Sequence, residues 1–222
     1  MKRLLSIYQY AAPVILAPLS LLLWRREYTG NLRLTMTAWL IPILWAYIVP
    51  GIGTNVLNVW EFDTRLRLGR FRPHHGFVFG SATAMMAWLV HGTPARSPWD
   101  ILRLSLILCC VIGFANLLYD IKALQSGILR VYNQPWADGR DEKAIALDYA
   151  PWFFGGFGAI YGAGIGLMEW IDARGGPSPV GFAAAFGVIL ILTLIVPTAG
   201  YVVQSIRRHG HWGTRPVRKQ VG

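Results

Sequence analysis

The sequence predicts an all-α, polytopic transmembrane helical bundle with six spans and both termini in the cytoplasm. The first observation behind this prediction is charge segregation: the 222 residues include 21 basic and 11 acidic side chains, yet six stretches carry none of them. Runs of roughly 18 or more mainly apolar residues are typical of membrane-spanning helices. The pattern excludes a soluble enzyme, a disordered chain and a secreted disulfide scaffold.

The second observation is the distribution of the basic residues, which gives the chain a net charge of +10. If the six stretches alternate across a membrane, fifteen of the 21 lysines and arginines fall on the side of the two termini. Basic residues stay on the cytoplasmic side of membranes, so this count predicts the orientation. We therefore expect membrane lipids as partners, no nucleic acid, and a location in the plasma (inner) membrane.

The predicted spans cover about residues 4–24, 35–58, 75–95, 101–119, 149–168 and 180–206. The first run ends in Leu-Leu-Leu-Trp-Arg-Arg without a cleavage site, so it is predicted to be retained as a helix. Pro42 and Pro50 favour a kink in the second. The charge-free part of the fourth, 104–119, rises only about 24 Å against a hydrocarbon core of about 30 Å, so five spans are the alternative.

The fifth stretch carries Gly158, Gly162 and Gly166 at four-residue spacing. Small residues at this spacing let another helix approach closely, either from this chain or from another subunit. The adjacent Cys109 and Cys110 lie in the fourth stretch and point about 100° apart on a helix, which favours small core residues over a disulfide. The whole chain, 1–222, is predicted to be one membrane domain, with a cytoplasmic loop at 120–148 and a basic cytoplasmic tail at 207–222.

Polar side chains gather on the predicted cytoplasmic side. Carboxylates and imidazoles there supply a candidate acid–base set: Asp63, His74, His75, Asp120 and Asp148. Arginines on the same side are candidates for holding an anionic headgroup: Arg65, Arg70, Arg72, Arg130 and Arg140. Trp136 lies in a turn-rich segment, 131–140, that could cap a substrate pocket.

Three interpretations of this polar surface remain open. It is a catalytic or ligand site, a metal site formed by Glu61, Asp63, His74 and His75, or a set of interfacial residues that contact acidic lipid headgroups. Adjacent histidines diverge on a helix, and no HxxxH spacing occurs, so the metal site is the less favoured interpretation and no metal ligand is included among the candidate site residues. The sequence leaves the cofactor unknown.

The leading functional hypothesis is a small membrane-embedded enzyme or lipid-binding protein that acts on an amphipathic, lipid or isoprenoid-like substrate at the cytoplasmic leaflet. The first alternative is a non-catalytic structural or assembly subunit of a larger membrane complex, for which the glycine face of the fifth stretch and the lack of a catalytic motif argue. The second is a small-solute transporter or channel. The lack of charged side chains in the middle of the stretches disfavours it.

Overall fold

A computed structural model of the chain describes residues 2–218, and it is mainly helical, with 74% helix and 4% strand. The first half holds α1 (Lys2–Ala11), η1 (Ala12–Leu16), α2 (Ala17–Glu27), α3 (Leu32–Asn55), β1 (Trp60–Phe62) and α4 (His75–His91). The second half holds α5 (Pro98–Gln125), β2 (Leu129–Val131), α6 (Gln134–Ala137), α7 (Glu142–Ala150), η2 (Pro151–Gly156), α8 (Phe157–Asp172) and α9 (Pro179–His209). The segments η1 and η2 are π-helical turns inside longer helices.

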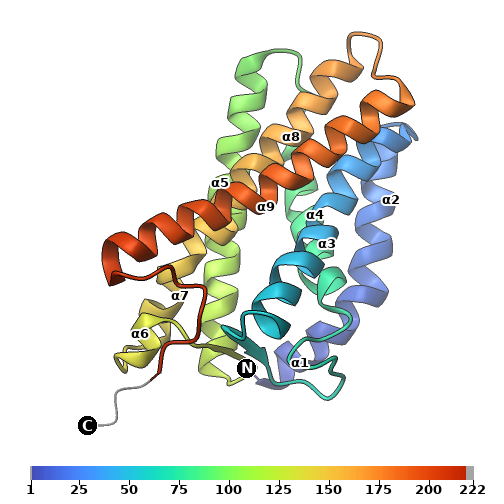
Figure 1. The fold of residues 1–222 in the computed structure, drawn as a ribbon. Coiled ribbons are helices and arrows are strands. Elements are labelled where there is room, and N and C mark those ends of the chain that lie inside the picture. Colours follow the sequence, from blue (N-terminus) through green and yellow to red (C-terminus); the bar gives the residue numbers. More distant parts are fainter. Residues whose placement is uncertain (1, 219–222) are drawn as a thin grey trace.

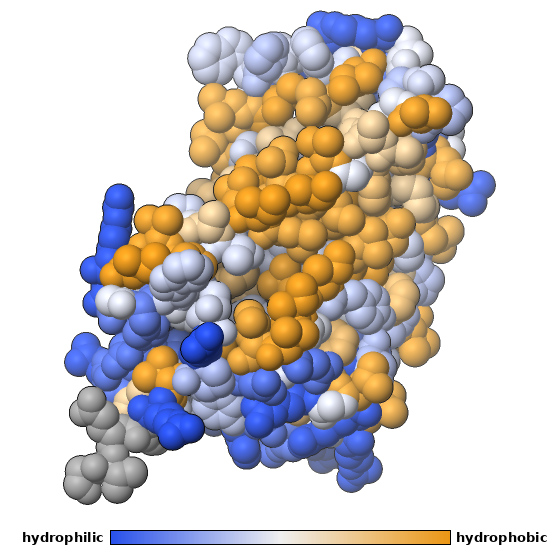
Figure 2. Space-filling view, viewed as in Figure 1, coloured by the Kyte–Doolittle hydropathy of each residue, from blue (hydrophilic) through white to orange (hydrophobic). Residues whose placement is uncertain are grey.

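Within the described residues, four helices are long and apolar enough to cross a membrane: Lys2–Glu27, Leu32–Asn55, Pro98–Gln125 and Pro179–His209. The helix α4, with 17 residues, is shorter, and α8, with 16, continues the helical path of α7 and η2. Figure 2 shows an apolar belt around the middle of the molecule, with hydrophilic side chains gathered mainly at its two ends. The long apolar helices and this belt indicate a helical membrane protein.

The chain runs back and forth between two ends (Figure 1). At one end, here called the strand end, Lys2 contacts Asp63, β1 pairs antiparallel with β2, and the backbone N–H of Val217 donates to the carbonyl of Tyr132. At the opposite end, the loops after α2, α4 and α8 meet, because Asn31 bonds to Asp172 and the backbone N–H of Ala95 donates to Glu169. Both described ends of the chain therefore lie at the strand end.

Several helix bounds differ from the expected ones, and the fourth expected span differs most. Its helix, α5, extends from Pro98 to Gln125 because Ser97 and Asp100 form a capping box at its start and Asp120 is held by a hydrogen bond near its end. The expected loop 120–148 is accordingly an ordered layer made of the end of α5, β2, α6 and α7. Of the expected tail, 207–222, the first three residues continue α9, and residues 219–222 lie outside the described part of the chain.

The glycine face of α8 packs on α5 of the same chain. A Cβ atom at Gly158 would lie 2.4 Å from the carbonyl oxygen of Leu108, and one at Gly162 would lie 2.7 Å from that of Leu104. A Cβ atom at Gly166 would lie 3.1 Å from its nearest neighbour, the Cα of Ile101. The backbones of α5 and α8 thus touch along this face, which leaves no space there for a helix of another subunit.

Candidate functional site

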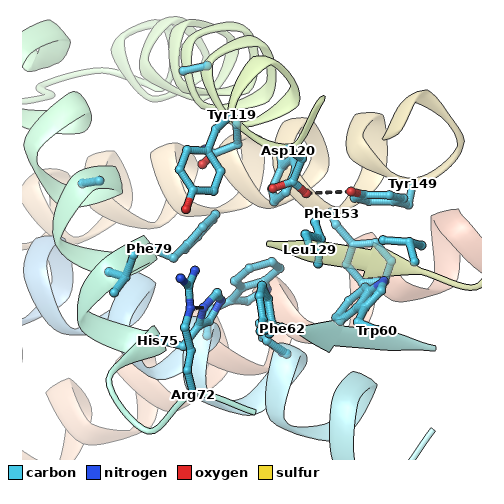
Figure 3. A pocket seen from close by; sticks show the side chains of 18 of the residues that line it. Trp60, Phe62, Arg72, His75, Phe79, Tyr119, Asp120, Leu129, Tyr149 and Phe153 are labelled. Carbon is cyan, nitrogen blue, oxygen red and sulfur yellow. Dashed lines mark hydrogen bonds between the residues drawn. The ribbon is translucent and has the colours of Figure 1, made fainter. Parts of the chain in front are cut away.

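A cavity of about 290 Å³ lies at the strand end of the bundle, between α1, α3, α4, α5, the two strands and the junction of α7 with η2. Figure 3 shows it from close by. Aromatic rings make up much of its wall, including those of Trp45, Trp60, Phe62, Phe79, Phe153 and Phe154. Among these apolar side chains lie a few polar ones, an arrangement that is common in sites for small organic ligands.

Arg72 is the central cationic group of this cavity, and only 1% of its surface is exposed. Its Nε donates to Nδ1 of His75 over 2.8 Å, one terminal nitrogen donates to Oε1 of Gln9 over 3.2 Å, and its guanidinium lies 4.7 Å above the ring of Phe62. No carboxylate of the described residues lies within ion-pair distance of it. Because an unpaired buried charge is costly, this guanidinium favours an anionic ligand.

The bond from Arg72 also defines the state of His75. An arginine N–H can only donate, so Nδ1 of His75 must accept, and the ring proton of the neutral imidazole then resides on Nε2. His75 is buried, and it packs against Phe62 with 4.7 Å between the ring centres. It can therefore present an N–H donor to a ligand next to the guanidinium.

A carboxylate and two tyrosines lie on the other side of the cavity. The hydroxyl of Tyr149 donates to Oδ2 of Asp120 over 2.7 Å, across the space between α7 and α5. The hydroxyl of Tyr119 is buried and has no hydrogen-bond partner among the described residues. Figure 3 shows that this hydroxyl and the guanidinium of Arg72 extend toward the same space. A bound oxyanion between them could accept from both.

Only three of the predicted site residues line the cavity: Arg72, His75 and Asp120. Asp63 is instead partly exposed at the strand end, where Lys2 lies 3.3 Å and Arg67 2.9 Å from its carboxylate, and the hydrogen bond from Lys2 lowers the pKa of this carboxyl. His74 precedes α4 and stacks on Tyr10 at 5.1 Å, and burial lowers the pKa of its imidazole. Neither side chain lines the cavity.

Asp148 has a different, structural environment. It lies inside α7 with 3% of its surface exposed, and it accepts from Nδ2 of Asn133 over 3.1 Å and contacts Nε2 of His209 at 2.8 Å. The backbone carbonyl of Asp148 accepts from Gln204. The residue thus ties α7 to α9 and to the turn before α6, whereas the cap of α7 is Asp141.

The remaining predicted arginines point away from the cavity. Arg65, Arg70, Arg130 and Arg140 are exposed. Arg130 shows the reason: successive side chains of a strand face opposite sides, so the buried Leu129 and Val131 place it outward. Trp136 is half-buried against Tyr132, with 4.9 Å between their ring centres, and does not line the cavity.

The alternative metal site is not assembled within the described part of the chain, where no three potential metal-ligating side chains gather. Glu61 accepts from the hydroxyl of Tyr132 over 2.7 Å, whereas His75 is bonded to Arg72.

Two groups of polar residues with buried contacts were not predicted from the sequence. Gln9, Tyr119 and Tyr149 contact the cavity or its arginine, but uncharged side chains in apolar helices carry no distinctive sequence signal. At the opposite end, Glu169 and His91 form a buried pair 2.5 Å apart. The sequence did contain a signal for this pair: a histidine inside the third charge-free stretch, His91, and an acidic residue directly after the fifth, Glu169, are ionisable side chains next to or within predicted membrane spans.

Comparison of the chain with protein-family models, with curated proteins and with solved structures finds no match.

Proposed function

We propose that the chain crosses a membrane six times with both termini in the cytoplasm, and that its cavity binds an amphipathic molecule at the cytoplasmic leaflet. In this proposal the protein is a small enzyme or lipid-binding protein of the plasma membrane. The anionic or electronegative head of the ligand contacts Arg72, His75 and Tyr119, and its apolar part lies among the aromatic rings. The class of ligand follows from the pairing of a cationic group with a mainly apolar wall.

The observation that carries the proposal is the buried guanidinium of Arg72, which has no carboxylate within ion-pair distance in the described part of the chain. Buried arginines that serve only the fold are normally paired with carboxylates, because the cost of removing the charge from water must be offset. Here the partners are neutral, namely an imidazole, an amide and an aromatic ring. An oxyanion from a ligand would supply the missing charge.

The cavity also has the groups that proton transfer requires. Asp120 carries a carboxylate hydrogen-bonded to Tyr149, and His75 carries a neutral imidazole with one ring N–H. If the protein is an enzyme, Asp120 is the candidate general base and the His75 N–H the candidate acid or oxyanion donor. A purely lipid-binding protein would need the arginine but not the carboxylate.

The binding proposal can be tested with two probes that share a tail and differ in the head, dodecyl phosphate and dodecanol. We expect dodecyl phosphate to raise the melting temperature of the purified protein in maltoside detergent, because a ligand that binds the folded state stabilises it. Dodecanol should have little effect. Equal stabilisation by both probes would contradict an anion site.

Two variants test whether the stabilisation by dodecyl phosphate depends on this cavity. Arg72→Gln should lose the response to dodecyl phosphate, whereas Arg65→Gln, which changes an exposed arginine of the same loop, should keep it. Since Arg72→Gln removes a buried group that also bonds to His75 and Gln9, Tyr119→Phe provides a second measurement. It deletes a hydroxyl that has no hydrogen-bond partner between residues 2 and 218, and it should weaken the response without lowering the melting temperature of the free protein. An unchanged response in both variants would refute the proposed site.

A further inference from the structure

A second cavity, of about 210 Å³, lies next to the first, between α3, α9 and the segment that follows α9. Its wall includes no Asp, Glu, Lys, Arg or His of the described residues. Several of its polar side chains are already bonded within the protein: Thr198 donates to the carbonyl of Leu194, Tyr132 to Glu61, Tyr149 to Asp120, and Asn133 to Ile145 and Asp148. The cavity therefore offers apolar surface and suits a hydrocarbon group.

The two cavities share one wall, formed by Trp60, Val131, Tyr149 and Phe153, which line both of them. It consists of side chains rather than a continuous stretch of helix backbone. Trp60 packs edge to face with Phe153 at 5.5 Å between ring centres, and it lies over Gly53, where a Cβ would come within 2.3 Å of its ring. Since side chains change rotamer far more readily than helices move, this wall is the point at which the two spaces can join.

The second cavity borders the surface that faces lipid in the proposed orientation. Ile52 lines the cavity and is 46% exposed; Val56, directly after α3, and Ile195, in the part of α9 that lines the cavity with Leu194 and Thr198, are also exposed apolar residues. Figure 1 shows α9 slanting away from α3 toward the strand end. A chain in the second cavity could thus extend into the bilayer.

From these contacts we infer that the second cavity holds the hydrocarbon tail of the molecule whose anionic head binds at Arg72, with the tail passing over the Trp60–Phe153 wall. The inference rests on the proposed function. The first cavity alone lies at the lower limit of the roughly 300–1,000 Å³ typical of ligand pockets, whereas the two together lie well inside this range. The ligand class is accordingly a long-chain anionic amphiphile rather than a small anion.

The inference predicts a dependence on chain length that is confined to the second cavity. Dodecyl phosphate should bind the wild-type protein at least about tenfold more tightly than octyl phosphate, because each buried methylene adds binding free energy. Filling the second cavity with Thr198→Trp or Ile52→Trp should leave the affinity for octyl phosphate unchanged and abolish this gain.

Each filling substitution has a control close by in the sequence: Ile195 lies in α9 with Thr198, and Val56 directly follows α3, which contains Ile52. Ile195→Trp and Val56→Trp introduce the same side chain at exposed positions that do not line the cavity, and they should keep the gain. Retention of the gain in Thr198→Trp and Ile52→Trp would overturn the inference. If neither probe binds the wild-type protein, the proposed anion site itself is refuted; binding of octyl phosphate without a gain for dodecyl phosphate refutes the tail site alone.

A photoreactive probe gives a direct readout. An alkyl phosphate with a diazirine at the end of its tail should label peptides from α3 around 48–57 and from α9 around 194–201. Labelling of α4 around 79–86 instead would show that the tail stays in the first cavity and would overturn the inference.

Discussion

At the scale of single residues, the buried charged groups at the two ends of the molecule, Glu169 and Arg72, differ in the partners that the protein provides for them. The carboxylate of Glu169 accepts from the hydroxyl of Tyr28 at 2.6 Å and from the backbone N–H of Ala95 at 2.8 Å, and it contacts His91 at 2.5 Å. Arg72 has no carboxylate of the described residues within ion-pair distance, and Asp120 acts on it only from across the cavity. A charge whose bonding capacity is satisfied by the protein serves the fold, whereas one left without a counter-ion is open to a ligand.

The Glu169 cluster should therefore control stability. Glu169→Leu leaves the N–H of Ala95, the hydroxyl of Tyr28 and the ring of His91 without their acceptor, and breaking a buried pair of this kind costs about 3–5 kcal/mol. Thermal unfolding in detergent would measure the loss. Glu27→Gln is the control: its side chain is 31% exposed and lies 3.5 Å from His91, so this substitution should cost much less. Similar melting temperatures for both variants would show that the cluster does not hold the loops together.

At the scale of elements, the spacing of glycines predicted a close helix contact but not the partner. Periodicity describes one helix, whereas the choice between α5 and a helix of another subunit depends on how the whole bundle packs together.

The same limit explains why the strands β1 and β2 were not predicted. Strands of three residues have no distinctive alternation, and their pairing joins segments about seventy residues apart. The α5 helix was underestimated for a local reason, since counting charges could not recognise that Asp100 caps it and Asp120 is hydrogen-bonded.

The contact between α5 and α8 makes a graded prediction. In Gly158→Ala and Gly162→Ala, the new methyl group would press against backbone atoms of Leu108 and Leu104, and overpacking of this kind typically costs about 1–3 kcal/mol. Gly187→Ala in α9 is the matched control, because nothing lies within 4 Å of its added methyl group. It should be neutral or stabilise the helix by roughly 0.5–1 kcal/mol. Chemical or thermal unfolding of the three variants checks the order, which would be wrong if Gly187→Ala were the least stable.

At the scale of the whole molecule, the sequence grouped the candidate polar residues on one side of the predicted membrane but did not indicate which side chains face inward. Charge counting placed Asp63, Arg65 and Arg72 in one connection, and nothing in their order distinguishes them. Arg72 points inward because it immediately precedes Pro73 and the start of α4, where its carbonyl accepts from the N–H of His75 and closes a turn. Inward and outward orientation is thus set by the packing of α1, α4 and the strand pair, which has no counterpart in a linear pattern.

The number of membrane crossings can be decided by labelling three positions. In a background with Cys109→Ala and Cys110→Ala, single cysteines would replace Arg96, Gln125 and Ala173; all three are exposed, Arg96 and Ala173 in connections between helices and Gln125 at the end of α5. With six crossings, a membrane-impermeant maleimide reaches Arg96→Cys and Ala173→Cys from outside, and Gln125→Cys only after permeabilisation. If only the four long helices crossed, residues 56–97 would remain inside and 126–178 outside, so that positions 96 and 125 would exchange sides while position 173 would not. Position 173 therefore serves as the internal control, and the other two positions distinguish the topologies.

We expect the six-crossing result, because α4 and α8 connect the same two ends of the bundle as the four longer helices. His91 at the end of α4 contacts Glu169 near the end of α8, far from the strands that precede these helices.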